Sequence, residues 1–329
     1  MTKKSQNILR YGFWIAVAVV LLYFCLRAVD WREFASALEQ CRWSFVALAI
    51  LLGAAALLLR GARWQMLLAP LDPSTRFITC FNAYTIGMAV NLGLPRVGEV
   101  VRLGYVVRHS AVAPDGKRLL SFDKALGTGV VERAWDALTV LVLTAVLLLL
   151  KREDFGPFLL ERLDGGKWWI LVAAGVLGLA LLLLAWLFRE KGIGRKIWGF
   201  VRGMGHGLVS FARMRRPWLF LLYTALIWVL HWLTSACIIW ALQDIPAFAS
   251  LTLADAFFLM IAGSLSTVIP VPGGFGAYHG IVAGALASIW NIPMGLGMVY
   301  ATLNHEAQVL MQAVLGLGSY IHESFFRKA

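Results

Sequence analysis

Charged side chains are scarce in this chain of 329 residues, because Lys, Arg, Asp and Glu make up only 15% of it while hydrophobic residues make up 60%. Globular proteins carry about 25% charged residues. No long stretch of the sequence has the composition of a soluble domain. The composition therefore excludes an ordinary soluble protein and places any chemistry in or beside a membrane.

The chain also lacks cysteines at the spacing of a metal site or a redox pair, and it lacks motifs for nucleic-acid recognition. The four cysteines are scattered at Cys25, Cys41, Cys80 and Cys237, without the spacing of a metal site or a redox pair. We interpret them as packing residues and expect neither a metal nor a cofactor. The net charge of +12 fits the excess of Lys and Arg in cytoplasmic loops of membrane proteins. We therefore expect no nucleic-acid partner.

Long apolar runs are what the chain does have, at 11–26, 43–59, 130–150, 168–188, 218–242 and 293–321. Most approach or exceed the roughly 20 residues that a helix needs to cross a bilayer. They predict an all-α fold, a polytopic transmembrane helical bundle with about six full spans. We expect one integral membrane domain over 1–329 in a bacterial plasma (inner) membrane, with both termini cytoplasmic. The first run lacks a small-residue cleavage site and is interpreted as a retained helix.

Loop charges give the topology and expose two runs that do not fit simple crossings. Segment 189–217 carries eight Lys and Arg against one Glu, which predicts a basic, weakly amphipathic cytoplasmic segment. The apolar stretch 77–94 lies between two basic segments assigned to the cytoplasm, so it must enter and return. We therefore predict a first re-entrant hairpin at about 77–108, turning near Pro95.

The second misfit consists of two apolar pieces, 256–269 and 275–289, which are shorter than a span. The sequence IPVPGGFG joins them, and no continuous helix tolerates it. This predicts a second hairpin at about 255–290, entering from the outside. Both turns contain Pro-x-x-Gly, which favours an inverted repeat with a binding site where the broken helices meet. The alternative is two loops at the membrane surface.

Ionisable residues near the first hairpin suit a phosphate group. Arg96 and Arg102 flank Glu99, guanidinium groups bind phosphate oxygens in a bidentate manner, and a helix beginning after Pro95 adds free N–H donors. Ordinary cytoplasmic-loop charges are the alternative.

A second polar group begins the next apolar run. Glu132, Arg133 and Asp136 can neighbour one another at helical spacing, and such a cluster in hydrocarbon is usually paired or faces a cavity. The alternative is a solvated helix end.

The second hairpin and the last span add further candidates. Gly273, Gly274 and Gly276 permit close backbone approach, and His279 follows one turn later. Glu306 is an ionisable group within an apolar run, and we expect it to pair with His305 or with an arginine of the first hairpin.

Three ordered motifs, NLGLPRVGEVVRLGYVVR, VVERAWD and IPVPGGFGAYHG, resemble the lysylphosphatidylglycerol synthase transmembrane-region family, also described as flippase-like. This family includes the flippase domain of the multiple peptide resistance factor. The resemblance implies a multispanning domain that moves a polar-headed lipid between leaflets. The substrate-binding positions that it implies are Asn91, Pro95, Gly98, Glu99, Arg102, Glu132, Arg133, Asp136, Pro270, Pro272, Gly273, Gly274 and Gly276. Many relatives carry a glutamate where this chain has His279, and Glu306 is the candidate substitute.

These observations favour a lipid flippase or lipid-transport protein for a phosphate-bearing lipid over an enzyme. The expected partners are an anionic phospholipid or a polyprenyl-phosphate-type lipid, with a second copy of the chain or a lipid-synthesis enzyme as further partners. The alternatives are a membrane transferase acting on such lipids and a secondary transporter of a small anion. The soluble aminoacyl-transfer domain of the lipid-modifying relatives is not recognised, so we do not expect lysyl transfer.

Overall fold

The computed structural model describes residues 19, 20, 23, 27, 31–150, 216–269 and 271–326. The predicted span 168–188, most of the span 11–26, nearly all of the basic segment 189–217, and Pro270 lie outside the described residues.

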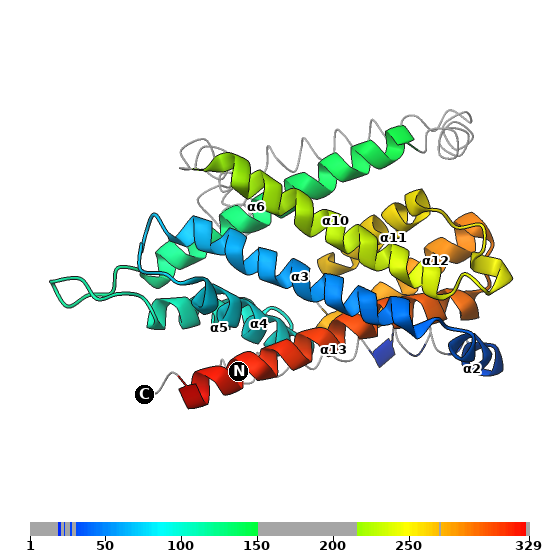
Figure 1. Ribbon diagram of the computed structural model, residues 1–329, viewed down its shortest axis with the longest axis horizontal. Coiled ribbons are helices and arrows are strands. Elements are labelled where there is room, and N and C mark those ends of the chain that lie inside the picture. Colours follow the sequence, from blue (N-terminus) through cyan, green and yellow to red (C-terminus); the bar gives the residue numbers. More distant parts are fainter. Residues whose placement is uncertain are drawn as a thin grey trace, which may run out of the picture. The chain divides into compact units, whose positions relative to one another are not determined.

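The described part of the chain contains nine α-helices and no strand, which confirms the all-α class (Figure 1). Within it, α3 and α10 are long and apolar enough to cross a bilayer. The helices are α2 (Trp31–Glu39), α3 (Trp43–Leu68), α4 (Phe77–Gly93), α5 (Val97–Arg108), α6 (Phe122–Leu150), α10 (Pro217–Ala241), α11 (Leu253–Leu265), α12 (Ala277–Trp290) and α13 (Met294–Phe326). Short 3-10 turns lie at η1 (Pro246–Phe248), η2 (Ser266–Val268) and η3 (Pro272–Gly274).

The chain divides into two compact units. The first comprises Met1–Ala125 and Phe220–Ala329, and the second comprises Leu126–Leu219. Most of α6 belongs to the second unit and is described by itself. Both interrupted hairpins belong to the first unit.

Helix α13 organises the first unit, because α2, α3, α4 and α12 all pack against it. The core beside it contains small, branched and aromatic residues such as Ala49, Ile238, Val282 and Tyr300, all buried. Small residues allow helix backbones to approach closely, and van der Waals packing drives helix association in a bilayer. The long red helix in Figure 1 is α13, with the α4–α5 hairpin beside its C-terminal half.

Helix α3 is longer than the predicted run, since it continues past residue 59 to Leu68 and includes Arg60 and Arg63. The fully buried Arg63 donates a hydrogen bond to Thr224 Oγ1 at 3.2 Å, and its guanidinium lies 5.6 Å from the Phe220 ring centroid. Arg60 lies 3.2 Å from His231 Nε2. These partners come from α10, so the apolar run alone does not show where α3 ends.

Candidate functional site

The first hairpin turns tightly, and one asparagine connects its two helices. Helix α4 ends at Gly93 and α5 begins at Val97, close to the predicted turn. The side-chain oxygen of Asn91 accepts a hydrogen bond from the Gly98 N–H at 2.8 Å, which satisfies one of the free donors in the first turn of α5. Arg96 in the turn has the left-handed φ of 65° and is exposed.

Close approach of α4 and α5 depends on Gly98. A Cβ atom built at this position would lie 1.8 Å from the carbonyl oxygen of Gly87, a backbone atom of the facing helix. Every residue other than glycine would therefore push the two helices apart. Gly98 and Asn91 were predicted to bind substrate, and the structure shows that both hold the hairpin closed.

Arg102 lies between α3, α4 and α5 and is only 3% exposed. Its guanidinium carbon is 4.7 Å from the Trp64 ring centroid and 4.8 Å from that of Tyr84. Its Nε is 2.9 Å from Glu99 Oε2, one helical turn earlier. Cation–π contacts of this kind stabilise by about 2 kcal/mol when desolvated. Arg102 therefore pairs with Glu99 on its own helix and holds the first hairpin against α3 through Trp64.

The second hairpin is interrupted as its sequence predicts. Helix α11 and η2 approach the turn, η3 forms it, and α12 leads away from it. Gly273, Gly274 and Gly276 have φ values of 57°, 81° and 77°. Glycine adopts this left-handed region without the penalty that a side chain brings.

The turns of the two hairpins contact each other. Turn η3 packs against α4, and a Cβ atom at Gly273 would lie 3.4 Å from the carbonyl oxygen of Leu92, near the end of α4. Broken helices that meet in this way form the substrate sites of many secondary transporters. The residues around these turns are therefore the candidate site.

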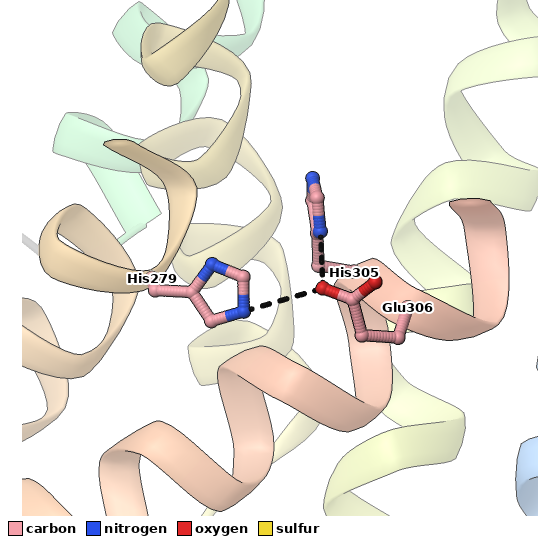
Figure 2. A group of neighbouring side chains, drawn as sticks. All are labelled: His279, His305 and Glu306. Carbon is pink, nitrogen blue, oxygen red and sulfur yellow. Dashed lines mark hydrogen bonds and ion pairs between the residues drawn. The ribbon is translucent and has the colours of Figure 1, made fainter. Parts of the chain in front are cut away.

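Helix α13 supplies ionisable groups to this site (Figure 2). His305 Nδ1 lies 2.9 Å from Glu306 Oε1, and His305 Nε2 lies 2.9 Å from the Gly273 carbonyl oxygen. His279, at the start of α12, has its Nε2 3.5 Å from the same Glu306 oxygen. Glu306 therefore pairs with His305, as expected, and also with His279.

The α6 candidates lie in the second compact unit. Glu132 is buried, Arg133 is exposed and Asp136 is half-buried, and each of them has at least one interaction partner. Helical spacing keeps the three side chains close to one another on α6.

Several residues near the site were not recognised in the sequence. Trp64 and Tyr84, which sandwich Arg102, are two such residues. Tyr278 is another, and its hydroxyl oxygen accepts a hydrogen bond from Asn304 Nδ2 at 2.6 Å. Aromatic residues are common in membrane helices, so only the three-dimensional contacts distinguish these from the rest.

Asp72, between α3 and α4, organises a loop beside the first hairpin and was also missed. Burial alone would raise the pKa of its carboxyl group. Hydrogen bonds from the Ser110 and Ser74 hydroxyls and from the Ala111 and Ser74 N–H groups outweigh burial and lower the pKa. The Ser110 hydroxyl donates at 2.6 Å and the Ala111 N–H at 3.0 Å. The carboxylate thus ties the α3–α4 loop to the segment after α5.

The fold and the site define the class of protein: an all-helical membrane protein with two helical hairpins that proline and glycine interrupt. The family model described as "Lysylphosphatidylglycerol synthase TM region" matches residues 13–316, and the chain belongs to this family. This confirms the family resemblance of the three motifs. No curated protein and no solved structure matches the chain.

Proposed function

We propose that the protein is a lipid translocase that moves a lipid with a phosphate-bearing polar headgroup between leaflets. Membership in a lipid-related membrane family supports an action on lipids. The single observation that carries the proposal is the contact between the turns of the two interrupted hairpins, next to ionisable side chains. Helices interrupted within a bilayer are tolerated where they are buried in protein or line a wet cavity.

Arg96 is the residue that we assign to the phosphate. It is exposed at the turn, immediately before the first turn of α5, where the positive end of the helix dipole favours an anion. Arg102 is buried and paired with Glu99, so it acts by positioning the hairpin. The exposed Arg133, with Glu132 and Asp136, is proposed as a second polar group on the lipid's path.

The expected cargo is an anionic phospholipid or a polyprenyl-phosphate-type lipid. The proposed setting is a bacterial inner membrane, with both termini cytoplasmic and both hairpins re-entrant. A second copy of the chain or a lipid-synthesis enzyme is the proposed protein partner.

Translocation of a headgroup-labelled anionic phospholipid in proteoliposomes tests this function. We expect Arg96→Ala to slow translocation by about tenfold or more, because a hydrogen bond to a charged group contributes about 1.5–3 kcal/mol. Arg108→Ala is the matched control, since it removes the same charge from the last turn of the same helix. The control should keep the wild-type rate.

Each outcome of this experiment is informative. Wild-type protein that moves no lipid, and carries no lipid detectable by mass spectrometry after purification, overturns the function. If Arg96→Ala and Glu132→Ala both transport as wild type does, the function stands and the site assignment fails. Uptake of a small anion driven by an ion gradient, without lipid movement, would identify a secondary transporter instead.

A further inference from the structure

Three side chains with metal-ligating atoms converge where the second hairpin meets α13. His279 comes from the first turn of α12, and His305 and Glu306 come from the middle of α13 (Figure 2). Their ligating atoms all lie within 4.8 Å of one another. His279 is 3% exposed and His305 11%, whereas Glu306 is 39% exposed. The group is thus shielded on its histidine side and accessible on its carboxylate side.

His305 faces two hydrogen-bond acceptors, and a neutral imidazole has only one N–H to offer them. A further positive centre is therefore needed beside this ring. The Gly273 carbonyl oxygen can only accept, so His305 Nε2 must carry the hydrogen of their 2.9 Å contact. A neutral imidazole has one N–H, which leaves a lone pair on Nδ1. This lone pair faces a carboxylate oxygen at 2.9 Å. Two acceptors at this distance repel each other unless a proton or a metal ion lies between them.

The hydrogen bond from His305 to a backbone carbonyl is an arrangement that metal-binding histidines use. Such a histidine commonly donates its other N–H to a backbone carbonyl, which fixes the tautomer and the orientation of the ring. Gly273 provides this carbonyl, and the neighbouring Gly274 lets the ring come close, since a Cβ there would lie 3.3 Å from His305 Nε2. The left-handed glycines of the turn therefore also orient the imidazole.

His279 adds an independent observation. It is almost fully buried, and in the described part of the chain its Nδ1 has no hydrogen-bond partner. Its Nε2 faces Glu306 Oε1 at 3.5 Å, too far for a strong hydrogen bond. A buried polar side chain without full satisfaction calls for a ligand or another explanation. A cation bound at Nε2 would replace this weak contact with a direct bond, and the ring hydrogen would then lie on Nδ1.

Distances and ligand types indicate which cation fits. Zinc-class ions bind histidine nitrogen and carboxylate oxygen at about 2.0–2.2 Å, so two ligand atoms on one ion lie about 3 to 3.5 Å apart. The separations of 2.9 Å and 3.5 Å to Glu306 Oε1 agree with this. Two imidazoles with one carboxylate suit a borderline divalent ion such as Zn²⁺ or Co²⁺, whereas Mg²⁺ and Ca²⁺ prefer oxygen ligands.

We propose that His279, His305 and Glu306 bind one divalent transition-metal ion of the zinc class. The ion joins the start of α12 to α13, and through His305 it fixes the turn of the second hairpin. The exposed side of Glu306 leaves a coordination position open for water or for an anionic oxygen. The scattered cysteines predict no metal, and this proposed site differs from that prediction because its ligands are histidine and glutamate.

Cobalt binding to the purified, chelator-treated protein in detergent tests this site without any transport assay. We expect Co²⁺ to bind with one equivalent per chain, to give visible d–d absorption, and to be displaced by Zn²⁺. His279→Ala, His305→Ala and Glu306→Gln should each weaken binding by about tenfold or more, since replacing residues that only hydrogen-bond to metal ligands already weakens binding about 10–100-fold. Failure of lipid transport would leave this result untouched.

The same helix offers a matched control. His322 and Glu323 form another adjacent His–Glu pair on α13, where they contact Asn82, Tyr105 and His109. The control variant His322→Ala should bind Co²⁺ as wild type does. Equal loss in this control, or wild-type protein that binds no Co²⁺ or Zn²⁺ while remaining folded, overturns the proposal. The latter result would identify the positive centre at His305 as a proton.

A measurement on the wild-type protein covers the case in which the cluster variants do not fold. X-ray absorption of the zinc-loaded protein should show nitrogen and oxygen ligands with the scattering pattern of two imidazoles. A spectrum without imidazole scattering overturns the site, whatever the stoichiometry.

Discussion

Gly98 shows how a single position without a side chain allows the first hairpin to form. The Gly87 carbonyl oxygen on the facing helix lies next to Gly98, and the Asn91 side chain accepts a hydrogen bond from the Gly98 N–H. Backbone atoms cannot move aside as a flexible side chain can. The Pro-x-x-Gly motif thus has a structural reason that does not depend on the substrate.

Gly98→Ala should destabilise the protein by about 1–3 kcal/mol, because overpacking a tight contact has this magnitude. Gly104→Ala is the control on the same helix, since no atom lies within 4 Å of a Cβ there. The control should be neutral or stabilising by up to about 1 kcal/mol through helix propensity. Thermal unfolding in detergent measures both, and equal melting temperatures for the two variants would contradict this account of Gly98.

Asp72 gives a prediction about pH at the same scale. Its pKa is lowered in the folded protein, so its contribution to stability is present above the pKa of the unfolded chain, about 4. This contribution is lost as the pH falls through the folded-state value. We expect Asp72→Asn to lower stability at pH 7 by about 1–3 kcal/mol, because hydrogen bonds to a buried charged group are lost.

The difference between wild type and Asp72→Asn should shrink as the pH falls below about 4. Asp115→Asn, in the exposed segment after α5, is the control and should follow wild type. Melting temperatures measured from pH 7 to pH 3 provide the test. A difference that stays constant over this range would show that the carboxylate charge is not the cause.

At the scale of the element, the sequence predicts where the helices of the two hairpins begin and end, but it does not predict the end of α3. The boundaries of α4, α5, α11 and α12 lie within a few residues of the predicted pieces, because proline and glycine interrupt apolar helices by local sterics. The end of α3 was missed because α10 supplies partners for Arg60 and Arg63. Local signals therefore identify turns well and buried charges poorly.

Gly274→Ala tests the turn of the second hairpin. Its φ of 81° lies in the left-handed region, where a side chain costs about 1–2 kcal/mol. Gly284→Ala on α12 is the control, because it is helical and no atom lies within 4 Å of its Cβ. We expect a lower melting temperature for Gly274→Ala alone. An equal response of the two variants would show that backbone conformation at the turn is not limiting.

At the scale of the whole molecule, the orientation of loops and hairpins in the bilayer remains a prediction from charge. The loop containing Asp115 is predicted to be cytoplasmic, and the loop containing Gln243 is predicted to be outside. The first hairpin is predicted to return to the cytoplasm. Its turn at Leu94 should therefore be out of reach from the outside.

Cysteine labelling in intact cells with a reagent that does not cross the membrane tests this topology. Of the native cysteines, Cys41, Cys80 and Cys237 are buried, which limits background labelling, and Cys25 can be replaced. We expect Gln243→Cys to be labelled from outside, and Asp115→Cys and Leu94→Cys only after permeabilisation. Labelling of Leu94→Cys from outside would make α4 and α5 two crossings instead of a re-entrant hairpin.

Composition and local sterics were enough to determine the helical class, the two interrupted hairpins and the family. These properties follow from apolar run length, from residues that break helices and from ordered motifs, all of which act over short distances along the chain. Only the tertiary structure assigned Arg102 to Trp64 and Tyr84, and brought His279 from α12 to His305 and Glu306 on α13. Partners so far apart in sequence are selected by helix packing, so no local pattern could show that Trp64 and Tyr84 enclose the Arg102 guanidinium, or that His279 lies beside His305 and Glu306.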